Sequence, residues 1–150
     1  MATYYSDIAG VNDPIIDHSG GLTVVPFSFT AAVALVTNDI LRLVKLPAGA
    51  TLIEFLIDAG ILGASTTVFN IGDSGSSTRF STGVVASAVS RISSGDVLVA
   101  AATGSAHGAL PRRYTAADDL RLTFTTVATG TTGAGAFVKG HVKYQTRFDG

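Results

Sequence analysis

The stretch AFVKGHVKYQTRF, from Ala136 to Phe148, alternates between two kinds of side chain. Period two over this length is typical of an antiparallel strand that packs one face on a core and exposes the other to water. The inward face carries Val138, Val142, Tyr144, Thr146 and Phe148, and the outward face carries Lys139, His141, Lys143, Gln145 and Arg147. The stretch therefore predicts a half-buried strand at this end of the chain.

The same alternation recurs upstream in short segments. Three of them are expected to point alternate residues inward: 51–58 (Ile53, Phe55, Ile57), 66–71 (Thr67, Phe69, Ile71) and 120–126 (Leu120, Leu122, Phe124). Further strands are expected at 22–30, 40–46 and 96–102, whereas 31–38 and 84–91 fit either a short helix or a strand. Seven or eight strands in 150 residues predict an all-β fold, an antiparallel β-sandwich or jelly roll.

Two connections have the composition of turns. The segment from Pro47 to Ala50 predicts a tight turn, since proline presets φ and glycine tolerates a left-handed conformation. The glycine-rich segment 128–135 is expected to join its flanking strands as a long hairpin loop. Frequent turns of this kind are the pattern of an all-β domain.

The first 21 residues differ from the rest because they show no sustained period. They combine turn formers with five large side chains, Tyr4, Tyr5, Ile8, Ile15 and Ile16. We expect residues 1–21 to form an extended N-terminal arm that lies on a partner through these side chains. Residues 22–150 are then expected to form a single jelly-roll β-sandwich domain.

The composition limits the kinds of partner. Hydrophobic residues make up 47% of the chain and charged residues only 14%, fewer than in most soluble domains. This apolarity fits either a light, alanine-rich core or an apolar surface that other subunits cover. The net charge is −1 and no basic cluster exceeds the pair Arg112–Arg113, which argues against a nucleic-acid partner.

The sequence lacks features that several other classes of protein need. Without cysteine there is no disulfide, no thiolate nucleophile and no zinc–thiolate site. The N-terminus lacks the basic and apolar regions of a signal peptide, and the longest apolar run, 29–36, is too short to span a bilayer. We therefore expect a soluble protein, made in a cytoplasm, with no membrane partner.

The letters GDSG at 72–75 match the surroundings of the nucleophile in trypsin-like serine proteases and make Ser74 a candidate. Such a site needs a histidine and a buried aspartate, but only His18 precedes Ser74, too close for the first barrel of that fold. A nucleophile elbow would need glycine where Ser76 stands. We therefore interpret 72–78 as a polar loop in which Asp73 and Ser74 bond their own backbone, and we do not expect an enzyme.

The remaining polar candidates are weaker. The three histidines, His18, His107 and His141, lack metal-ligand spacing. The pair Asp118–Asp119 suits a turn or cap better than a cation site, and Glu54 and Asp58 suit a solvated or interface face better than acid–base catalysis. No catalytic residue, metal site or cofactor is therefore predicted.

The outward face of the last strand carries a basic stripe. Lys139, Lys143 and Arg147 recur at every fourth residue, with His141 between them. The stripe fits either a solvated face or a contact with an acidic partner surface, so these four residues are the candidate contacts of the domain itself.

Several motifs follow one another in a recognisable order. The run TNDILRLVKLPAGATL at 37–52 is followed by VFNIGD at 68–73, Arg79–Phe80, ADDLRLTF at 117–124 and GHVKY at 140–144. Over residues 22–148 this order resembles the small head proteins of tailed bacteriophages, in which an LPAGA segment leads into a strand and a later strand ends in an IGD-type loop. The resemblance implies a capsid decoration (cement) protein of jelly-roll type.

The resemblance also implies a structural role. Such a protein sits on the outside of the phage head, over joints between major capsid subunits, and acts as a homo-oligomer, either a dimer or a trimer. Its partners are the major capsid protein and further copies of itself, and it reaches the virion after synthesis in the host bacterial cytoplasm. Many copies of a bridging domain add small association energies by avidity.

The alternative is a carbohydrate- or receptor-binding β module of a phage tail or fibre. Such modules stack sugars on exposed Trp or Tyr, whereas this chain has no Trp and four Tyr, two of them in the arm. Copy number separates the two hypotheses, because a head protein is present in many copies and a tail protein in few.

Overall fold

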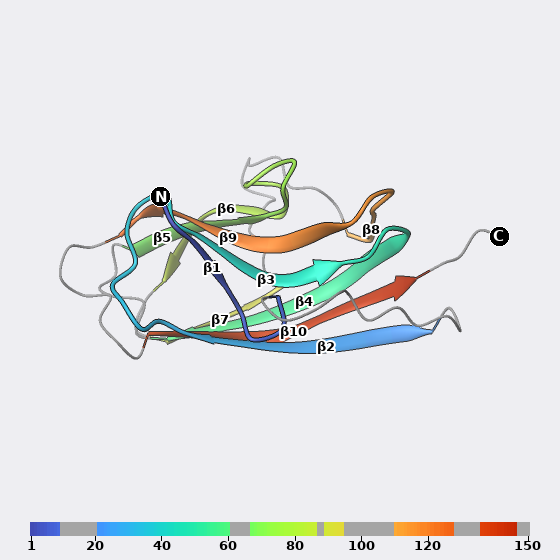
Figure 1. Ribbon diagram of the computed structural model, residues 1–150, viewed down its shortest axis with the longest axis horizontal. Helices are drawn as coiled ribbons and strands as arrows, with labels where there is room; N and C mark the ends of the chain where they lie inside the picture. Colours follow the sequence, from blue (N-terminus) through green and yellow to red (C-terminus); the bar gives the residue numbers. More distant parts are fainter. Residues whose placement is uncertain (10–20, 61–66, 87–88, 95–109, 128–135, 147–150) are drawn as a thin grey trace.

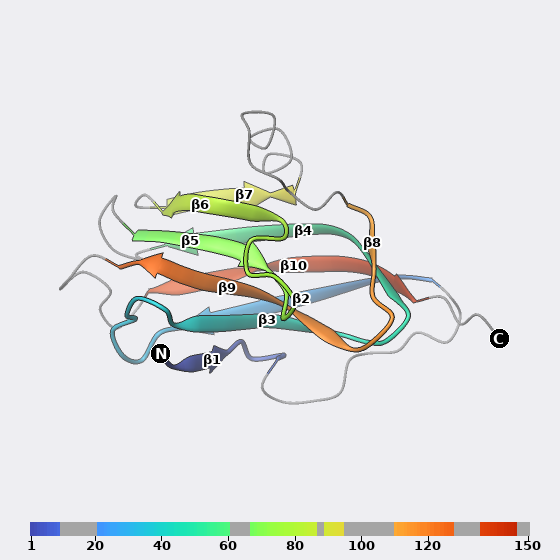
Figure 2. The same ribbon diagram turned by 90° about the horizontal axis from the view of Figure 1, so that it is seen from above.

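The computed structural model describes residues 1–9, 21–60, 67–86, 89–94, 110–127 and 136–146, which form β-strands in two facing layers (Figures 1 and 2). The strands are β1 (Thr3–Tyr5), β2 (Leu22–Thr30), β3 (Ile40–Leu46), β4 (Ala50–Gly60), β5 (Thr67–Gly72), β6 (Ser81–Ala86), β7 (Val89–Ser93), β8 (Arg112–Arg113), β9 (Asp118–Thr126) and β10 (Phe137–Thr146). No helix in these ranges is long and apolar enough to cross a membrane.

The strands divide between two sheets. Sheet A has the order β1–β3–β9–β5–β6, and sheet B has the order β2–β10–β4–β7, with β8 paired to β4. All pairs among the described strands are antiparallel except the parallel pair β1–β3. Consecutive described strands lie in different sheets, except that β5 is followed by β6 in sheet A and β7 by β8 in sheet B. The predicted antiparallel sandwich of jelly-roll type is thus confirmed.

The core lies between the inward faces of the two sheets. Phe69 on β5 meets Phe124 on β9 edge to face, with ring centroids 6.0 Å apart. Phe55 on β4 meets Phe80 in the same way at 5.8 Å, so these rings join the sheets through their interior. All four side chains are buried, as is Tyr144 on β10.

The last strand follows the predicted alternation. Val138, Val142 and Tyr144 are fully buried, whereas Lys139 is exposed. Gly140 takes an inward position where β10 and β4 approach closely, and a Cβ there would collide with the carbonyl oxygen of Leu56. The alternation of the neighbouring strands β5 and β9 is confirmed too, because Phe69, Ile71, Leu120, Leu122 and Phe124 are all buried.

One inward position was predicted wrongly. Ile53 was expected beside Phe55 and Ile57, but it is 38% exposed, and Leu52 is buried instead. The register between β10 and β4 shifts between Lys143 and Tyr144, leaving Ile53 without a partner. This β-bulge adds one residue to β4 and reverses the alternation on its N-terminal side.

Some of the predicted connections between strands are confirmed and others are wrong. The predicted hairpin between β9 and β10 is wrong, because β9 pairs with β3 and β5 while β10 pairs with β2 and β4. Residues 31–38 form neither helix nor strand, 84–91 contributes to β6 and β7, and the strand expected at 96–102 lies outside the described residues. The turn at Pro47–Ala50 is confirmed, since Ala50 N donates to Pro47 O at 3.1 Å and Gly49 has a φ of 81°.

Candidate functional site

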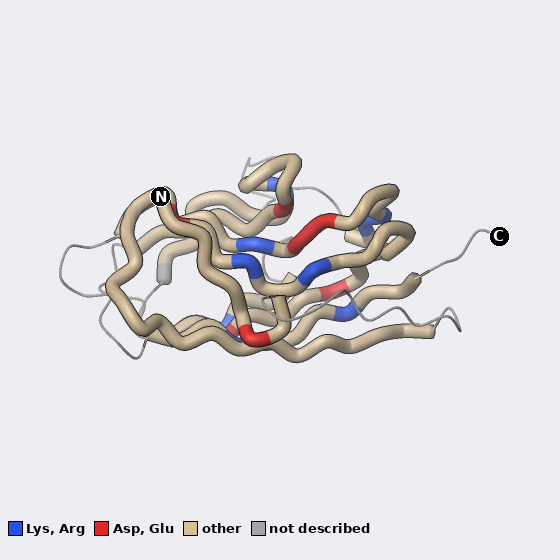
Figure 3. The backbone as a smooth tube through the Cα atoms, viewed as in Figure 1, with Lys and Arg blue, Asp and Glu red and all other residues tan. Residues whose placement is uncertain are grey.

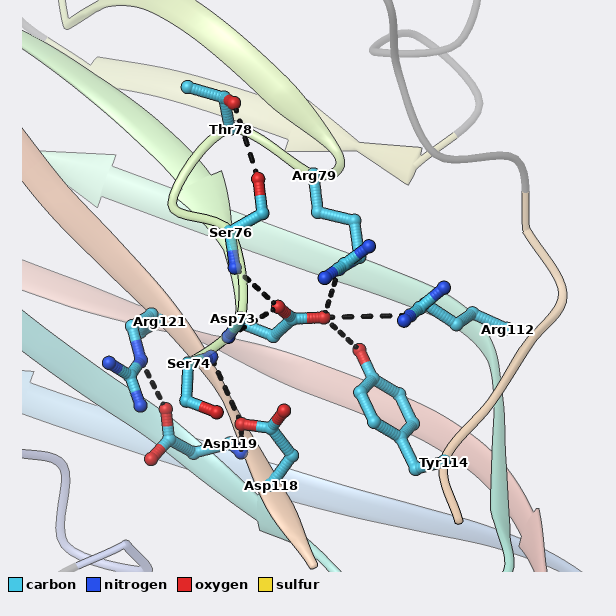
Figure 4. A network of polar contacts seen from close by, with 11 residues as sticks. Asp73, Ser74, Ser76, Thr78, Arg79, Arg112, Tyr114, Asp118, Asp119 and Arg121 are labelled. Atoms are coloured by element: carbon cyan, nitrogen blue, oxygen red, sulfur yellow. Dashed lines mark hydrogen bonds and ion pairs between the residues drawn. The ribbon is translucent and has the colours of Figure 1, made fainter. Parts of the chain in front are cut away.

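The GDSG segment forms a loop after β5 that is built around one buried carboxylate (Figure 4). Asp73 Oδ1 accepts hydrogen bonds from Gly75 N at 3.0 Å and from Ser76 N at 2.9 Å. Asp73 therefore bonds its own loop as predicted. For Ser74 the structure gives a different bond, from its backbone amide to Asp118 Oδ1 at 3.0 Å.

The second oxygen of Asp73 joins this loop to a distant part of the chain. Asp73 Oδ2 accepts a hydrogen bond from Tyr114 Oη at 3.2 Å and pairs with Arg79 and with Arg112 Nε, the latter at 3.5 Å. Burial and the charge of Asp73 raise the pKa of the Tyr114 hydroxyl. The phenol therefore stays protonated and donates, so the network is a structural tie rather than an acid–base pair.

A second carboxylate lies between two arginines on the outer face of sheet A. Asp119 on β9 pairs with Arg121 Nε at 2.5 Å and with Arg42 Nε of β3 at 3.4 Å. The guanidinium of Arg42 lies 5.4 Å from the ring centre of Tyr5 on β1. The pair Asp118–Asp119 was expected in a turn or cap, but the two residues begin β9 and pair with β3. Asp118 Oδ1 accepts from the amide of Asp119 at 2.7 Å as well as from the amide of Ser74.

These residues surround a cleft of about 270 Å³ on sheet A. Its lining is mixed in charge and comes from β1, β3, β9 and the loop after β5. The residues are Tyr5, Ala9, Arg42, Lys45, Ser74, Ala117, Asp118, Asp119 and Arg121. Within the described ranges, no three His, Cys, Asp or Glu side chains come together as metal ligands.

The outer face of sheet B carries the predicted basic stripe, but the stripe faces carboxylates on β4 (Figure 3). Lys143 Nζ donates to both oxygens of Glu54 at 3.1 Å, and His141 Nε2 lies 3.8 Å from the same carboxylate. Lys139 stands opposite Asp58 in the strand register. Arg147 lies outside the described residues, so its place in the stripe stays a prediction.

Asp58 is paired from its other side as well. Arg91 Nε on β7 lies 2.8 Å from Asp58 Oδ1. The hydrogen bond from Arg91, opposed in part by burial, holds the pKa of Asp58 below its usual value. The charges of this face are therefore largely matched across neighbouring strands.

Apolar side chains adjoin these pairs on sheet B. Leu22 is 57% exposed and Val24 is 50% exposed, both on β2. A broad groove of about 550 Å³ runs between β2, β10 and β4, lined in part by Val24, Pro26, Leu56 and His141. The exposed apolar side chains thus lie on the edge strand β2, beside the charged pairs of β10, β4 and β7.

The described part of the predicted arm lies on the chain's own sandwich. Thr3–Tyr5 pairs with β3, and Ser6 N donates to Arg42 O at 2.9 Å. Asp7 bonds the free edge of β2, with Asp7 N to Ser28 O at 2.9 Å and Ser28 N to Asp7 Oδ1 at 2.7 Å. This N-terminal segment therefore bridges the edges of the two sheets.

The five predicted contact residues of the arm are consequently not equivalent. Tyr4 packs against the core and its ring lies 5.9 Å from that of Phe29. Tyr5 and Ile8 are 47% and 38% exposed, and are available to a partner. Ile15 and Ile16 lie outside the described residues, so the arm beyond residue 9 and the boundary at 21 and 22 stay predictions.

Sequence reasoning missed the partners of the two aspartates. Tyr114 stands 41 residues from Asp73 in sequence, and Arg42 reaches Asp119 only because β3 pairs with β9. The alternation of β9 does place Asp119 and Arg121 on the same outward face. This spacing was the one feature of the sequence that could have indicated their ion pair.

Comparison with known proteins identifies the fold. No protein-family model matches the chain, and no curated protein matches its sequence. A chain in the capsid of Ralstonia phage GP4 is similar over 98% of this chain and 99% of its own length, with a TM-score of 0.72 and 18% identity. A chain in the capsid asymmetric unit of cyanophage Pam1 is similar over 93% of this chain and 94% of its own, with a TM-score of 0.59 and 20% identity. At these identities the likeness establishes the fold.

Proposed function

We propose that the protein is a structural virion protein that binds the outside of a phage capsid, bridges major capsid subunits and stabilises the head. The observation that carries the proposal is the end-to-end likeness of its fold to a chain in the capsid of Ralstonia phage GP4. The likeness spans both chains almost completely, so it concerns the whole sandwich rather than one common motif.

The surfaces of the sandwich suit such a role. A protein that bridges neighbours needs separate contact surfaces, and the outer faces of sheets A and B point away from each other (Figure 1). Sheet B offers exposed Val24 and Pro26 beside the paired charges of Lys143 and Glu54. We assign this face to the contact with the capsid, together with Tyr5 and Ile8 of the N-terminal segment.

The geometry gives no support to a hydrolase at Ser74. The histidine that the structure describes, His141, faces Glu54 on sheet B, whereas Ser74 follows β5 of sheet A. Asp73 is already occupied by its loop amides, Tyr114 and two arginines, and does not orient a histidine.

The experiment is reconstitution on heads that lack the protein. Purified protein is added to expanded heads, which are then separated from free protein, and the bound copies are counted by quantitative mass spectrometry. We expect saturable binding and an increase in the temperature at which the heads rupture. Binding to isolated tails and not to heads would contradict the proposal and favour the tail or fibre module.

The contact face is tested separately with Val24→Asp. The change places a charge among the apolar side chains of the edge strand β2, at a position that is already half exposed. We expect weaker head binding with unchanged folding by circular dichroism. Thr125→Asp on the outer side of sheet A is the matched control, because Thr125 is exposed on the opposite sheet.

A further inference from the structure

Most of the described sheet edges are protected against pairing with another chain. In sheet A, the edge strand β1 has three residues, and the other edge strand, β6, is bent. The register of β6 with β5 shifts between Phe69 and Ile71, and Gly83 has a φ of 67°. In sheet B, one edge is made of the two-residue β8 and of β7, whose Arg91 is paired with Asp58. Short length, charge and bulges are the usual means of preventing unintended strand pairing.

The remaining edge, formed by β2 in sheet B, lacks these protections over its first half. The nine residues of β2, LTVVPFSFT, include no charged side chain, as Figure 3 shows. Leu22 and Val24 lie on its outer side and are 57% and 50% exposed. An uncharged edge strand with exposed apolar side chains is a template for strand pairing.

The hydrogen bonds of Asp7 show which backbone groups of β2 point away from β10. Asp7 N donates to Ser28 O at 2.9 Å, and Ser28 N donates to Asp7 Oδ1 at 2.7 Å, so both backbone groups of Ser28 face the free edge. Successive residues of a strand direct these groups to alternate sides, so Leu22, Val24 and Pro26 face that edge too. Among the described residues, none bonds the edge groups of Leu22 and Val24.

The second half of the β2 edge is closed to a partner strand. Pro26 has no N–H group to donate, and Ser28 is already bonded to Asp7. Pairing is therefore confined to residues 22–24, and a partner strand can add there while residues 1–9 stay in place.

We propose that the protein forms a two-fold dimer in which residues 22–24 of β2 pair antiparallel with the same residues of a second copy. Thr23 lies on the two-fold axis, and Leu22 stands opposite Val24 of the other copy. Because the edge groups of Leu22 and Val24 both point outward, each of the two Leu22–Val24 pairs forms two backbone hydrogen bonds. The pairing also brings these exposed side chains together across the strands.

A second copy fits this edge because the strand is complementary to itself. Since β2 carries no charge, two copies meet without like-charge repulsion, and one pairing covers both exposed apolar side chains. A register centred on Val24 is disfavoured, because it would place Pro26, which has no donor, opposite Leu22. The contact uses the same residues of both copies, so the assembly closes at a dimer.

The dimer goes beyond the proposed capsid role and does not depend on it. A two-fold axis normal to the sheet turns the outer faces of both copies of sheet B toward the same side. The dimer therefore presents the surface with Val24 and Pro26 twice to one partner. Two linked contacts bind more tightly than one, because the first raises the effective concentration of the second.

The test uses the isolated full-length protein in sedimentation-velocity ultracentrifugation over a range of concentrations. We expect a reversible equilibrium between monomer and dimer, with no larger species. Val24→Pro removes an edge N–H that no described residue accepts, and should weaken dimerisation about thirtyfold, the size expected for two lost backbone hydrogen bonds per dimer. Val24→Thr is the matched control, because it keeps the N–H and the β-branched shape and should retain most of the affinity.

The register is tested with charges at the two exposed positions. Val24→Lys places a charge against Leu22 of the other copy and should weaken the dimer. Adding Leu22→Asp to the same chain should restore it, because the two new charges then meet across the axis. Both positions are half exposed or more, so the substitutions leave the core intact, and circular dichroism checks this.

Sedimentation as a monomer at the highest soluble concentration would overturn the proposal. Equal dimerisation of Val24→Pro and Val24→Thr, or no recovery in the double variant, would do the same. Hydrogen exchange gives an independent check, since the amides of Leu22 and Val24 should exchange fast in dilute protein and slowly in concentrated protein. Slow exchange in the dilute monomer would show that the chain covers this edge itself, and would also overturn the proposal. A dimer that does not bind heads would remove the capsid role and leave this interface in place.

Discussion

The charged side chains on the outer faces of the two sheets are paired in different ways. On sheet B, Glu54 and Asp58 of β4 each face basic side chains of neighbouring strands, so the charges nearly cancel beside an apolar groove. On sheet A, Asp119 is shared by Arg42 and Arg121, and Asp73 is shared by Arg79 and Arg112. The described charges are thus paired between neighbouring strands beside an apolar groove on sheet B, and they gather around shared carboxylates on sheet A.

Net charge and sequence stripes are poor guides to the surface of a β-sheet, because strand pairing decides which charges meet. The basic stripe of β10 was the candidate for an acidic partner, but cross-strand carboxylates compensate it. The arginines that share Asp119 lie on β3 and β9, where no stripe is evident in either strand alone. The pairing of β3 with β9 brings them together.

The largest expected change in stability comes from removing the Asp73 carboxylate, which bonds the loop after β5 to Tyr114 and two arginines. Asp73→Ala should lower the free energy of unfolding by about 3 kcal/mol, because it leaves loop amides and two arginines without their acceptor. Urea denaturation measures the change. Ser74→Ala is the control in the same loop and should change stability by less than about 0.5 kcal/mol.

An Asp73→Ala variant as stable as the unmodified protein would contradict the view that this network holds the loop and Tyr114 together. A large effect of Ser74→Ala would show that the hydroxyl has a role that its backbone bond to Asp118 does not explain.

The next effect concerns the segment that joins the edges of the two sheets. Deleting residues 1–9 removes the bonds of Ser6 to β3 and of Asp7 to Ser28, and should cost about 2 kcal/mol of stability. It also frees the edges of β2 and β3, so we expect concentration-dependent association by analytical ultracentrifugation. Asp7→Asn should show a smaller loss and no association.

A deletion variant that is as stable and as monodisperse as the full chain would show that residues 1–9 are a dispensable arm. The bridge between β2 and β3 would then contribute little to the sandwich.

A smaller effect is expected from the ion pair of sheet B. A double-mutant cycle with Glu54→Gln and Lys143→Gln should give a coupling energy of about 0.5 kcal/mol, since both side chains are partly exposed. The coupling should shrink in 1 M salt. A coupling near zero at low salt would leave the stripe uncompensated and remove the contrast between the sheets.

The smallest effect is a pH dependence from Asp58. Its pKa is lower in the folded protein than in the unfolded chain, so the pair with Arg91 stabilises the fold above the unfolded pKa, and this contribution disappears as pH falls through the folded pKa. We expect Asp58→Asn to lose stability at pH 7 but to match the unmodified protein near pH 2. Equal stability of both proteins at pH 7 would contradict the assignment.

Much of the fold was predictable because alternation is a local signal. The segments 22–30 and 40–46 were predicted with the bounds that β2 and β3 have. The bulge at Ile53 was not predictable, because it depends on the register with β10. The assignment of β9 and β10 to different sheets also depends on partners far away in sequence.

The polar sites were predictable only as fragments. The loop bonds of Asp73 follow from local turn chemistry, which the letters GDSG contain. Its bonds to Tyr114 and Arg112 require β8 and the following residues to return to the end of sheet A, which no local pattern predicts. The bridge that residues 1–9 form between the two sheets was not predicted either. Its only strand, β1, has three residues and is too short to show a period.

The most direct test of the central claim is the copy number of the protein in purified virions, with heads and tails separated before quantification against the major capsid protein. The proposed role predicts on the order of hundreds of copies, all on heads, because bridging contacts act through many repeated sites. A few copies per particle, found with the tails, would contradict it.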